Sequence, residues 1–254
     1  MPKLFCVSDV HGFYDEMIDA LNKVGFDPNN EEHWIVSCGD NMDRGKQPRD
    51  VMNFLMSLPR KVLVKGNHEC LMMDLLTREF PYNHDWNNGT AQSIIDLAPS
   101  ANTFDEACSM IYPKISKFID GMVNYFETKN YIFVHSFVPL NCYDHLPAYY
   151  REDRKYSKIE NWREAHQRQW DDAMWGNPFE LAEQGLLPDK TLVFGHWHCS
   201  YGWAIAEDRD MFDGDARFEP FFGDGFIAID ACTARSGKVN VLVLEDEFLE
   251  SDVN

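Results

Sequence analysis

The chain has 254 residues, of which 44% are apolar and 14% aromatic, and its formal net charge at pH 7 is −19. A chain of this length and apolar content can bury a substantial core, which excludes a disordered protein. No apolar run approaches the ~20 residues that a membrane-spanning helix needs, and we therefore expect no membrane partner. The negative charge argues against nucleic-acid partners, because it would repel phosphate backbones.

The seven cysteines are scattered along the chain, which is typical of reduced core thiols rather than of a disulfide framework. The N-terminus leads directly into the apolar residues 4–7, with no basic stretch or cleavable apolar segment before them. These two features predict a cytoplasmic protein.

Short β-type runs alternate with amphipathic stretches in the first third of the chain. Apolar side chains recur at helical spacing from Met17 to Val24, and Gly25 then ends the expected helix. Pro48 suits the first turn of a second helix, and a third should begin at Glu69. This β-α-β-α-β-α order favours a largely parallel sheet. The strands expected in it are residues 4–8, 34–37 and 61–64.

The remainder of the chain is less regular. Residues 81–122 and 141–190 are expected to form mostly helical insertions, and a hairpin should pair residues 125–126 with 131–134. Because no shift in composition marks a boundary, we predict one domain over residues 1–254. Later strands are expected at residues 191–194, 226–229 and 239–244.

Polar and charged side chains follow five of these strands at the points where the strands end. In open α/β sheets, ligands bind beyond the carboxyl ends of the strands, so these side chains should share one crevice. Imidazoles mixed with carboxylates suit Mn²⁺, Fe²⁺ and Zn²⁺, and one aspartate can bridge two ions about 3.5–4 Å apart. Most of these motifs alone would more often be a turn or a core histidine, but their joint occurrence favours a metal site. The side chains concerned are Asp9, His11, Asp40, Asp43, Arg44, Asn67, His68, His135, His196 and His198.

Three of the motifs resemble the signature of a known family. Asp-x-His-Gly at residues 9–12, Gly-Asp-x-x-Asp-Arg-Gly at 39–45 and Gly-Asn-His-Glu at 66–69 resemble the phosphoprotein phosphatase branch of the calcineurin-like metallophosphoesterases, which includes bacterial serine/threonine phosphatases. The Asp-Arg-Gly extension is the most specific part. The resemblance implies an α/β fold of two packed mixed β-sheets flanked by helices.

The resemblance also implies two bound divalent metal ions, Mn²⁺ being the expected ion and Fe or Zn the alternatives. It assigns Asp9 and His11 to the first ion and makes Asp40 the ligand that both ions share. The second ion would be held by Asn67, His135 and His196.

The catalytic roles implied by the resemblance follow from the same motifs. His68 would be the general acid toward the leaving alkoxide, oriented by Asp43, while Arg44 would bind two phosphate oxygens. A hydroxide between the metals would attack phosphorus directly, without a phosphoenzyme. Asn88 lies in a segment that resembles a loop near the cleft in bacterial members and would contact substrate; a plain surface turn is the alternative.

The sequence departs from the family pattern at three points. Ser136 and Phe137 follow His135 where the family usually has small residues. Their side chains are expected to occupy space in the wall of the site beside the second metal. The family's second phosphate-binding arginine has no clear counterpart, since Arg163 and Arg168 are weak substitutes.

His198 is the third departure. Alternate side chains of an extended backbone point the same way, so His198 should face the metals if His196 does. We therefore expect His198 to bind the first metal, as in phosphodiesterases of the superfamily. A histidine hydrogen-bonded beside the site is the alternative.

These features favour a phosphomonoesterase that acts on phosphoserine or phosphothreonine in proteins and also hydrolyses small phosphate esters. The first alternative is a phosphodiesterase or dinucleoside polyphosphate hydrolase, which the histidine pair at 196 and 198 supports. The second is a scaffold without catalysis, which the full set of ligands and the general acid argue against.

Overall fold

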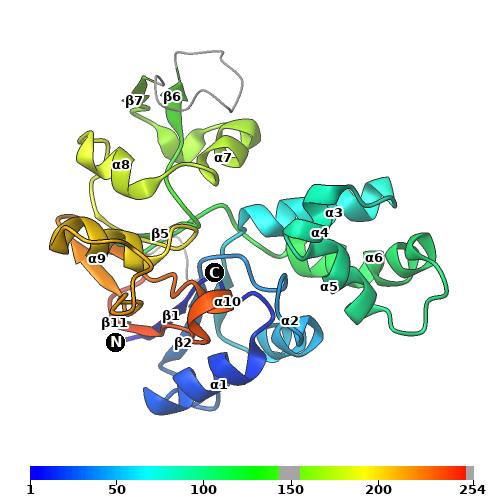
Figure 1. Cartoon of the computed structure of the whole chain (residues 1–254). Helices are drawn as coiled ribbons and strands as arrows, with labels where there is room; N and C mark the ends of the chain where they lie inside the picture. Colours follow the sequence, from blue (N-terminus) through cyan, green and yellow to red (C-terminus); the bar gives the residue numbers. More distant parts are fainter. Residues whose placement is uncertain (143–154, 250–254) are drawn as a thin grey trace.

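The computed structural model describes residues 1–142 and 155–249 (Figure 1). They form a mixed α/β fold with two main mixed β-sheets flanked by helices, as the sequence predicts. Across these two ranges, none of the helices has both the length and the apolar character needed to span a membrane.

The first sheet has the strand order β11-β1-β2-β3. Its strands β1, β2 and β3 are parallel, and β11 lies antiparallel to β1. The predicted alternation of strands and helices is therefore confirmed, with α1 and α2 as the connections. The bounds are β1 Lys3–Val7, α1 Tyr14–Lys23, β2 His33–Ser37, α2 Pro48–Ser57, β3 Lys61–Leu63 and β11 Leu242–Glu245.

The second sheet has the strand order β4-β5-β8-β10-β9. Strands β5, β8 and β10 are parallel, while β4 and β9 are antiparallel edge strands. The predicted hairpin across residues 125–134 is confirmed by the β4–β5 pair. The bounds are β4 Phe126–Glu127, β5 Tyr131–Phe133, β8 Thr191–Phe194, α9 Cys199–Glu207, β9 Phe221–Gly223, β10 Phe226–Ala228 and α10 Thr233–Ser236.

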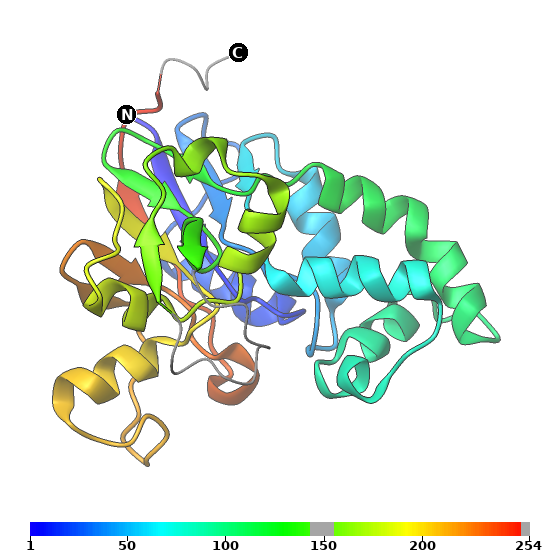
Figure 2. The same ribbon diagram turned by 90° about the horizontal axis from the view of Figure 1, so that it is seen from above.

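The two sheets pack on each other through a buried apolar layer. Leu4 and Val36 from the first sheet and Phe133, Val193 and Ile227 from the second belong to one core cluster. Strands that are buried on both faces appear as continuous apolar runs, which is why the sequence located them. Figure 2 shows the strands of the two sheets side by side.

Helices of the segment after β3 extend from the sheets as an arm (Figures 1 and 2). Ile94, Ile115 and Phe118 connect this arm to the core cluster under the first sheet. The bounds are α3 Asn67–Arg78, α4 Asn83–Asn87, α5 Thr90–Leu97 and α6 Phe104–Asp120.

The segment 141–190 contains more than the expected helices. Its first described part pairs β6 (Leu140–Cys142) with β7 (Tyr156–Lys158), a strand pair that the sequence did not predict. Both strands are three residues long, too short to produce a recognisable alternation. The helices α7 (Gln167–Ala173) and α8 (Pro178–Glu183) follow, and residues 143–154 lie outside the described residues.

Candidate active site

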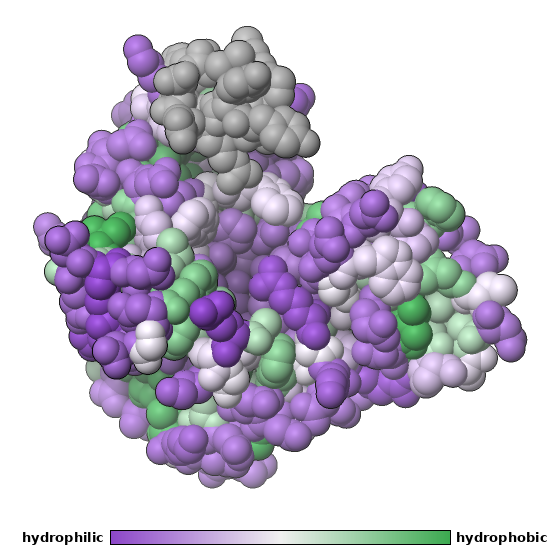
Figure 3. Space-filling model, viewed as in Figure 1, coloured by the Kyte–Doolittle hydropathy of each residue, from purple (hydrophilic) through white to green (hydrophobic). Residues whose placement is uncertain are grey.

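A cavity of about 260 Å³ opens beyond the carboxyl ends of the parallel strands. Figure 3 shows a hollowed, mainly hydrophilic region here, between the helical arm and the part of the molecule that carries α9. The cavity thus lies where the strand-end motifs meet. It is lined by Asp9, His11, Asp40, Arg44, Asn67, His68, Leu71, Asn88, Trp175, His196, His198, Asp230, Cys232 and Thr233.

The backbone at the strand ends is strained. Asp9, His11, Asp40 and His196 have φ angles of 51°, 50°, 58° and 65°, in the left-handed region that residues other than glycine rarely adopt. Such strain persists only where the surroundings impose it, and it concentrates at functional sites. Gly66 shows how tight the surroundings are, because a Cβ there would collide with the Asp40 carboxylate.

Asp40 lies between two groups of potential metal ligands. Its Oδ2 is 3.8 Å from His11 Nε2 on one side and 3.5 Å from His135 Nε2 on the other. Ligand atoms about 2.1 Å from a shared ion in tetrahedral geometry would be roughly 3.4 Å apart, so these spacings suit a metal. The two groups are His11 with Asp40 and His68, and Asp40 with His135 and His196.

The hydrogen bonds around His135 also fit a cation. His135 Nδ1 donates to the Cys38 carbonyl at 2.8 Å, so Nε2 of the neutral ring carries a lone pair. That nitrogen faces Asn67 Oδ1 at 2.7 Å, and the same oxygen is 3.1 Å from His196 Nδ1. The lone pair of His135 Nε2 thus faces the Asn67 oxygen, an arrangement that an ion between them would stabilise, and the donor set suits a borderline divalent metal.

Glu69 holds the two loops that frame Asp40, a role that the sequence did not reveal. Its Oε2 accepts hydrogen bonds from the backbone N–H groups of Asp40 at 2.9 Å and Gly66 at 2.8 Å. Its Oε1 accepts from the backbone N–H of Asn41 at 2.9 Å. Burial raises the pKa of Asp40 itself, with Asp9 and Glu69 acting in the same direction and His68 opposing them. Divalent cations on its oxygens would favour the charged form.

His68 and Asp43 form a buried pair. His68 Nδ1 lies 2.8 Å from Asp43 Oδ2, and that oxygen also accepts a 2.6 Å hydrogen bond from Thr90 Oγ1. Burial disfavours the charged form of His68, but the carboxylates of Asp40 and Asp43 outweigh it and raise the pKa of His68. Thr90 begins α5, so the helical arm supports this pair. No sequence motif indicated this role of Thr90.

The Arg44 guanidinium spans the two histidines at the cavity floor. Its Nη1 is 3.0 Å from His11 Nε2, and its Nη2 is 3.1 Å from His68 Nε2. Gly89 packs so closely on the Arg44 backbone that a Cβ there would lie 2.7 Å from Arg44 N. The neighbouring Asn88 lines the cavity, and its contact with substrate stays a prediction.

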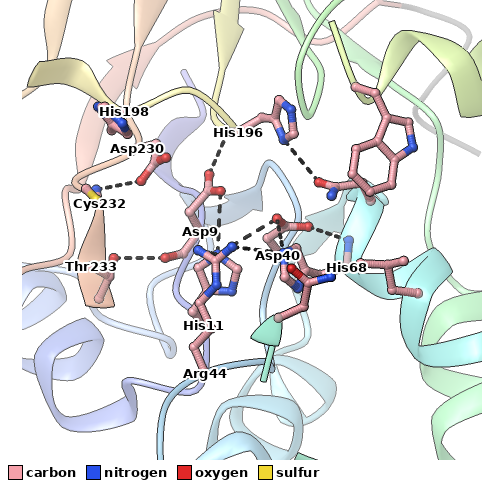
Figure 4. Close-up of a pocket in the computed structure, with 14 residues that line it drawn as sticks. Asp9, His11, Asp40, Arg44, His68, His196, His198, Asp230, Cys232 and Thr233 are labelled. Carbon is pink, nitrogen blue, oxygen red and sulfur yellow. Dashed lines mark hydrogen bonds and ion pairs between the residues drawn. The ribbon is translucent and has the colours of Figure 1, made fainter. Parts of the chain in front are cut away.

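Asp9 is fixed from three directions, and Figure 4 shows two of these contacts, from His196 and Thr233. Its Oδ2 accepts hydrogen bonds from the His196 backbone N–H at 2.9 Å and from Ser8 Oγ at 2.5 Å. Thr233 Oγ1 donates to the Asp9 carbonyl at 2.8 Å. Burial and the nearby Asp9 charge raise the pKa of Asp230, a cavity residue that no sequence motif identified.

A family model described as calcineurin-like phosphoesterase matches residues 2–200 of this sequence. The chain belongs to the calcineurin-like phosphoesterase family. The resemblance of the sequence motifs is therefore confirmed, and the fold and the Asp40-centred clusters are those of a metal-dependent phosphoesterase.

Curated relatives of the family match the chain over short stretches. The symmetrical bis(5'-nucleosyl)-tetraphosphatase of Shigella dysenteriae is 39% identical over 74 residues, which are 29% of this chain and 26% of that protein. Serine/threonine-protein phosphatase 2 of Salmonella typhimurium is 34% identical over 71 residues, 28% of this chain and 31% of that protein. The matches thus span about a quarter to a third of these relatives.

A solved structure of the cold-active protein-tyrosine phosphatase from a psychrophilic Shewanella has the same fold. It superposes with a TM-score of 0.54 at 16% sequence identity, and the alignment covers 96% of this chain and 76% of that chain. At this level of identity the similarity concerns the fold alone.

His198 lies at the edge of the calcineurin-like site, beside Asp230 (Figure 4). It lines the cavity, but it belongs to neither of the two groups around Asp40. Its Nδ1 is 2.9 Å from Ser200 Oγ, and its ring lies 4.9 Å from that of Phe212. Burial lowers the pKa of His198, although the nearby Asp9 opposes this. Binding of the first metal by His198 stays a prediction.

The other departures from the family pattern lie away from the cavity. Phe137 does not bulk the wall as expected; it is buried in the core cluster of the second sheet. Arg163 is bound to Glu127 at 2.7 Å and to Asp189 at 3.1 Å and does not line the cavity, and Arg168 is exposed on α7. Among the described residues, Arg44 is the only arginine or lysine in the lining.

Proposed function

We propose that this chain is a phosphomonoesterase with two divalent metal ions, Mn²⁺ being the expected ion, that acts on phosphoserine or phosphothreonine in proteins and on small phosphate esters. The observation that carries the proposal is the His68–Asp43 pair beside Arg44 and the Asp40-centred ligand groups. A proton donor, a phosphate-binding guanidinium and a metal-ligand set are the parts that direct hydrolysis of a phosphate ester requires.

The metal ligands would come from both sheets. Asp9, His11 and Asp40 would hold the first ion, and Asn67, His135 and His196 would hold the second together with Asp40. Ions bound there would lower the pKa of a coordinated water and neutralise charge on the phosphoryl group.

Arg44 would exchange partners when the first ion and the substrate bind, because an ion on His11 Nε2 takes the lone pair that Arg44 Nη1 now contacts. Its guanidinium now spans His11 and His68, and a phosphoryl group has the oxygens to receive both of its nitrogens. The exchange would free His68 Nε2, the nitrogen that faces the cavity while Nδ1 is held by Asp43. His68 in its charged form would then donate the Nε2 proton to the leaving alkoxide, and its raised pKa suits that role.

The small volume of the cavity favours a monoester substrate with one phosphoryl group. Its volume of about 260 Å³ lies just below the range of ~300–1,000 Å³ that is typical of pockets for drug-sized ligands. Arg44 is the single basic side chain among the described lining residues, and one guanidinium suits one phosphoryl group. The similarity to the Salmonella serine/threonine-protein phosphatase also supports a phosphoprotein substrate.

A comparison of substrates tests this function. With Mn²⁺, Fe²⁺ or Zn²⁺ added, kcat/KM for a phosphoserine peptide should exceed the values for bis-p-nitrophenyl phosphate and diadenosine tetraphosphate by at least about tenfold, a difference of ~1.4 kcal/mol in transition-state stabilisation. A preference for either of the other two compounds would contradict the proposal.

A hydrolase of diesters or dinucleoside polyphosphates is the second candidate, because His198 lines the cavity and the Shigella tetraphosphatase is similar over 74 residues. If His198 binds the first metal, a metal-bound structure should place one of its nitrogens about 2.0–2.3 Å from an ion. His198→Ala should then lower turnover of the diester more than that of the monoester. With both ions present and His198 beyond hydrogen-bonding reach of them, this candidate would lose its main support.

A further inference from the structure

Trp175 is an exposed aromatic residue in the cavity wall that the proposed chemistry does not use. The residue is 39% exposed, although most other lining residues are polar or charged. Isolated exposed apolar side chains are common on protein surfaces and need no explanation. Trp175 differs because its indole ring is 6.2 Å from the imidazole ring of His196, one of the proposed metal ligands.

The connection between α7 and α8 holds Trp175 in position. The backbone N–H of Trp175 donates to the Asp172 carbonyl at 3.3 Å. The carbonyl of the next residue, Gly176, accepts a 2.9 Å hydrogen bond from Ser136 Oγ. Because Ser136 directly follows His135, this bond ties the Trp175 loop to the loop that supplies a proposed metal ligand. The backbone that carries the indole is therefore fixed beside the site, which reduces the entropic cost of binding a ligand against it.

No ring in the described part of the chain stacks on the indole. Within residues 1–142 and 155–249, His196 is the only aromatic ring in contact with Trp175, and the two planes are nearly perpendicular at 87°. An indole face of this kind stacks on any planar ring, because every nucleobase and every aromatic side chain has a π-face.

We propose that Trp175 is a specificity-determining residue that stacks on a planar ring carried close to the phosphoryl group of the substrate. This inference rests on the proposed phosphoesterase function and narrows its substrate class. Arg44 would bind the phosphoryl group and Trp175 the ring, so that two contacts orient one substrate. The ring can be the nucleobase of a nucleotide or an aromatic side chain beside a phosphorylated residue.

Two pairs of substrates isolate the ring contact, because the two members of each pair share the same type of phosphate ester and differ in the ring. The first pair is 5′-AMP and ribose 5-phosphate, and the second is a phosphoserine peptide with phenylalanine next to the phosphoserine and its cyclohexylalanine analogue. In Trp175→Ala, kcat/KM for the ring-bearing member of at least one pair should fall roughly five- to hundredfold, the usual contribution of one stacked base. The partner compound should change by less than about twofold, and Trp175→Phe should retain most of the preference.

The pattern of loss identifies the source of the ring. A loss confined to 5′-AMP supports a nucleotide, and a loss confined to the phenylalanine peptide supports a protein segment. Equal losses within both pairs, or no loss in either, would overturn the proposal. Phe222→Ala is the matched control, because this aromatic residue is 62% exposed and does not line the cavity.

Binding measurements distinguish a failure of this proposal from a failure of the proposed function. If the wild-type protein hydrolyses none of the esters, the phosphoesterase function fails, and titration calorimetry with both pairs decides the role of Trp175. Tighter binding of a ring-bearing compound to the wild type than to Trp175→Ala, without such a difference for its partner, supports stacking. Identical affinities of the two proteins for all four compounds refute it.

Discussion

Asp40→Asn should lower kcat by at least about a thousandfold and reduce the bound metal to one ion or none. The aspartate lies between both groups of potential ligands, with Oδ2 3.8 Å from His11 Nε2 and 3.5 Å from His135 Nε2. A neutral amide bridges two cations poorly, and the electrostatic stabilisation by a metal pair is worth several kcal/mol. Metal content by mass spectrometry and turnover of a phosphate monoester measure the two effects.

The substitution keeps the shape of the site, which makes its result interpretable. The amide oxygen can still accept the 2.9 Å hydrogen bond from the His68 backbone N–H, and the Glu69 contacts to the Asp40 backbone are unaffected. Glu127→Gln is the control, because Glu127 is a buried carboxyl group that pairs with Arg163 outside the cavity. Two bound ions together with near-normal turnover in Asp40→Asn would show that Asp40 is not the shared ligand.

His68→Asn is expected to lower kcat for an alkyl phosphate by roughly 10²–10⁴, the usual contribution of a general acid. The loss should shrink for p-nitrophenyl phosphate, because p-nitrophenolate leaves with little need of a proton. His84→Asn, an exposed histidine outside the cavity, should behave as the wild type.

The pH profile gives a second readout of His68. Asp40 and Asp43 raise the pKa of His68 above its ordinary value despite burial, and the acid is active only in the protonated form below that pKa. In the wild type, kcat for the alkyl phosphate should therefore fall as pH rises through this pKa, and the alkaline limb should be absent from His68→Asn. Equal losses on both substrates with an unchanged profile would assign His68 another role, such as the metal ligation that its distance of 3.9 Å from Asp40 Oδ2 permits.

The parts of the fold that the sequence predicted are those with a local signal. β1, β2 and β8 are buried on both faces and appear as apolar runs, and the chemical groups follow directly at their ends. The edge strand β9 and the β6–β7 pair were missed. Each of these strands has only three, partly exposed residues, which is too few to show an alternation of apolar and polar side chains.

The site residues that belong to a sequence motif were predicted. Those that only the tertiary structure brings to the site were missed. Glu69 reaches the Asp40 loop across 29 residues, and Thr90 reaches Asp43 across 47. Neither contact has a local pattern, since each depends on how α3 and the helical arm pack against the strand ends. Trp175 is a similar case, because its place in the cavity wall depends on the bond between Ser136 and Gly176.

The proposed metal ligands come from both sheets, so ion binding to them would be coupled to the association of the two halves of the fold. Asp9 and Asp40 follow strands of the first sheet, and His135 and His196 follow strands of the second. An ion that binds this set only when the sheets are packed together stabilises the folded chain by mass action, by about 2.7 kcal/mol when its free concentration is a hundred times its dissociation constant. A chelator that removes the ions would then lower the free energy of unfolding by the same amount.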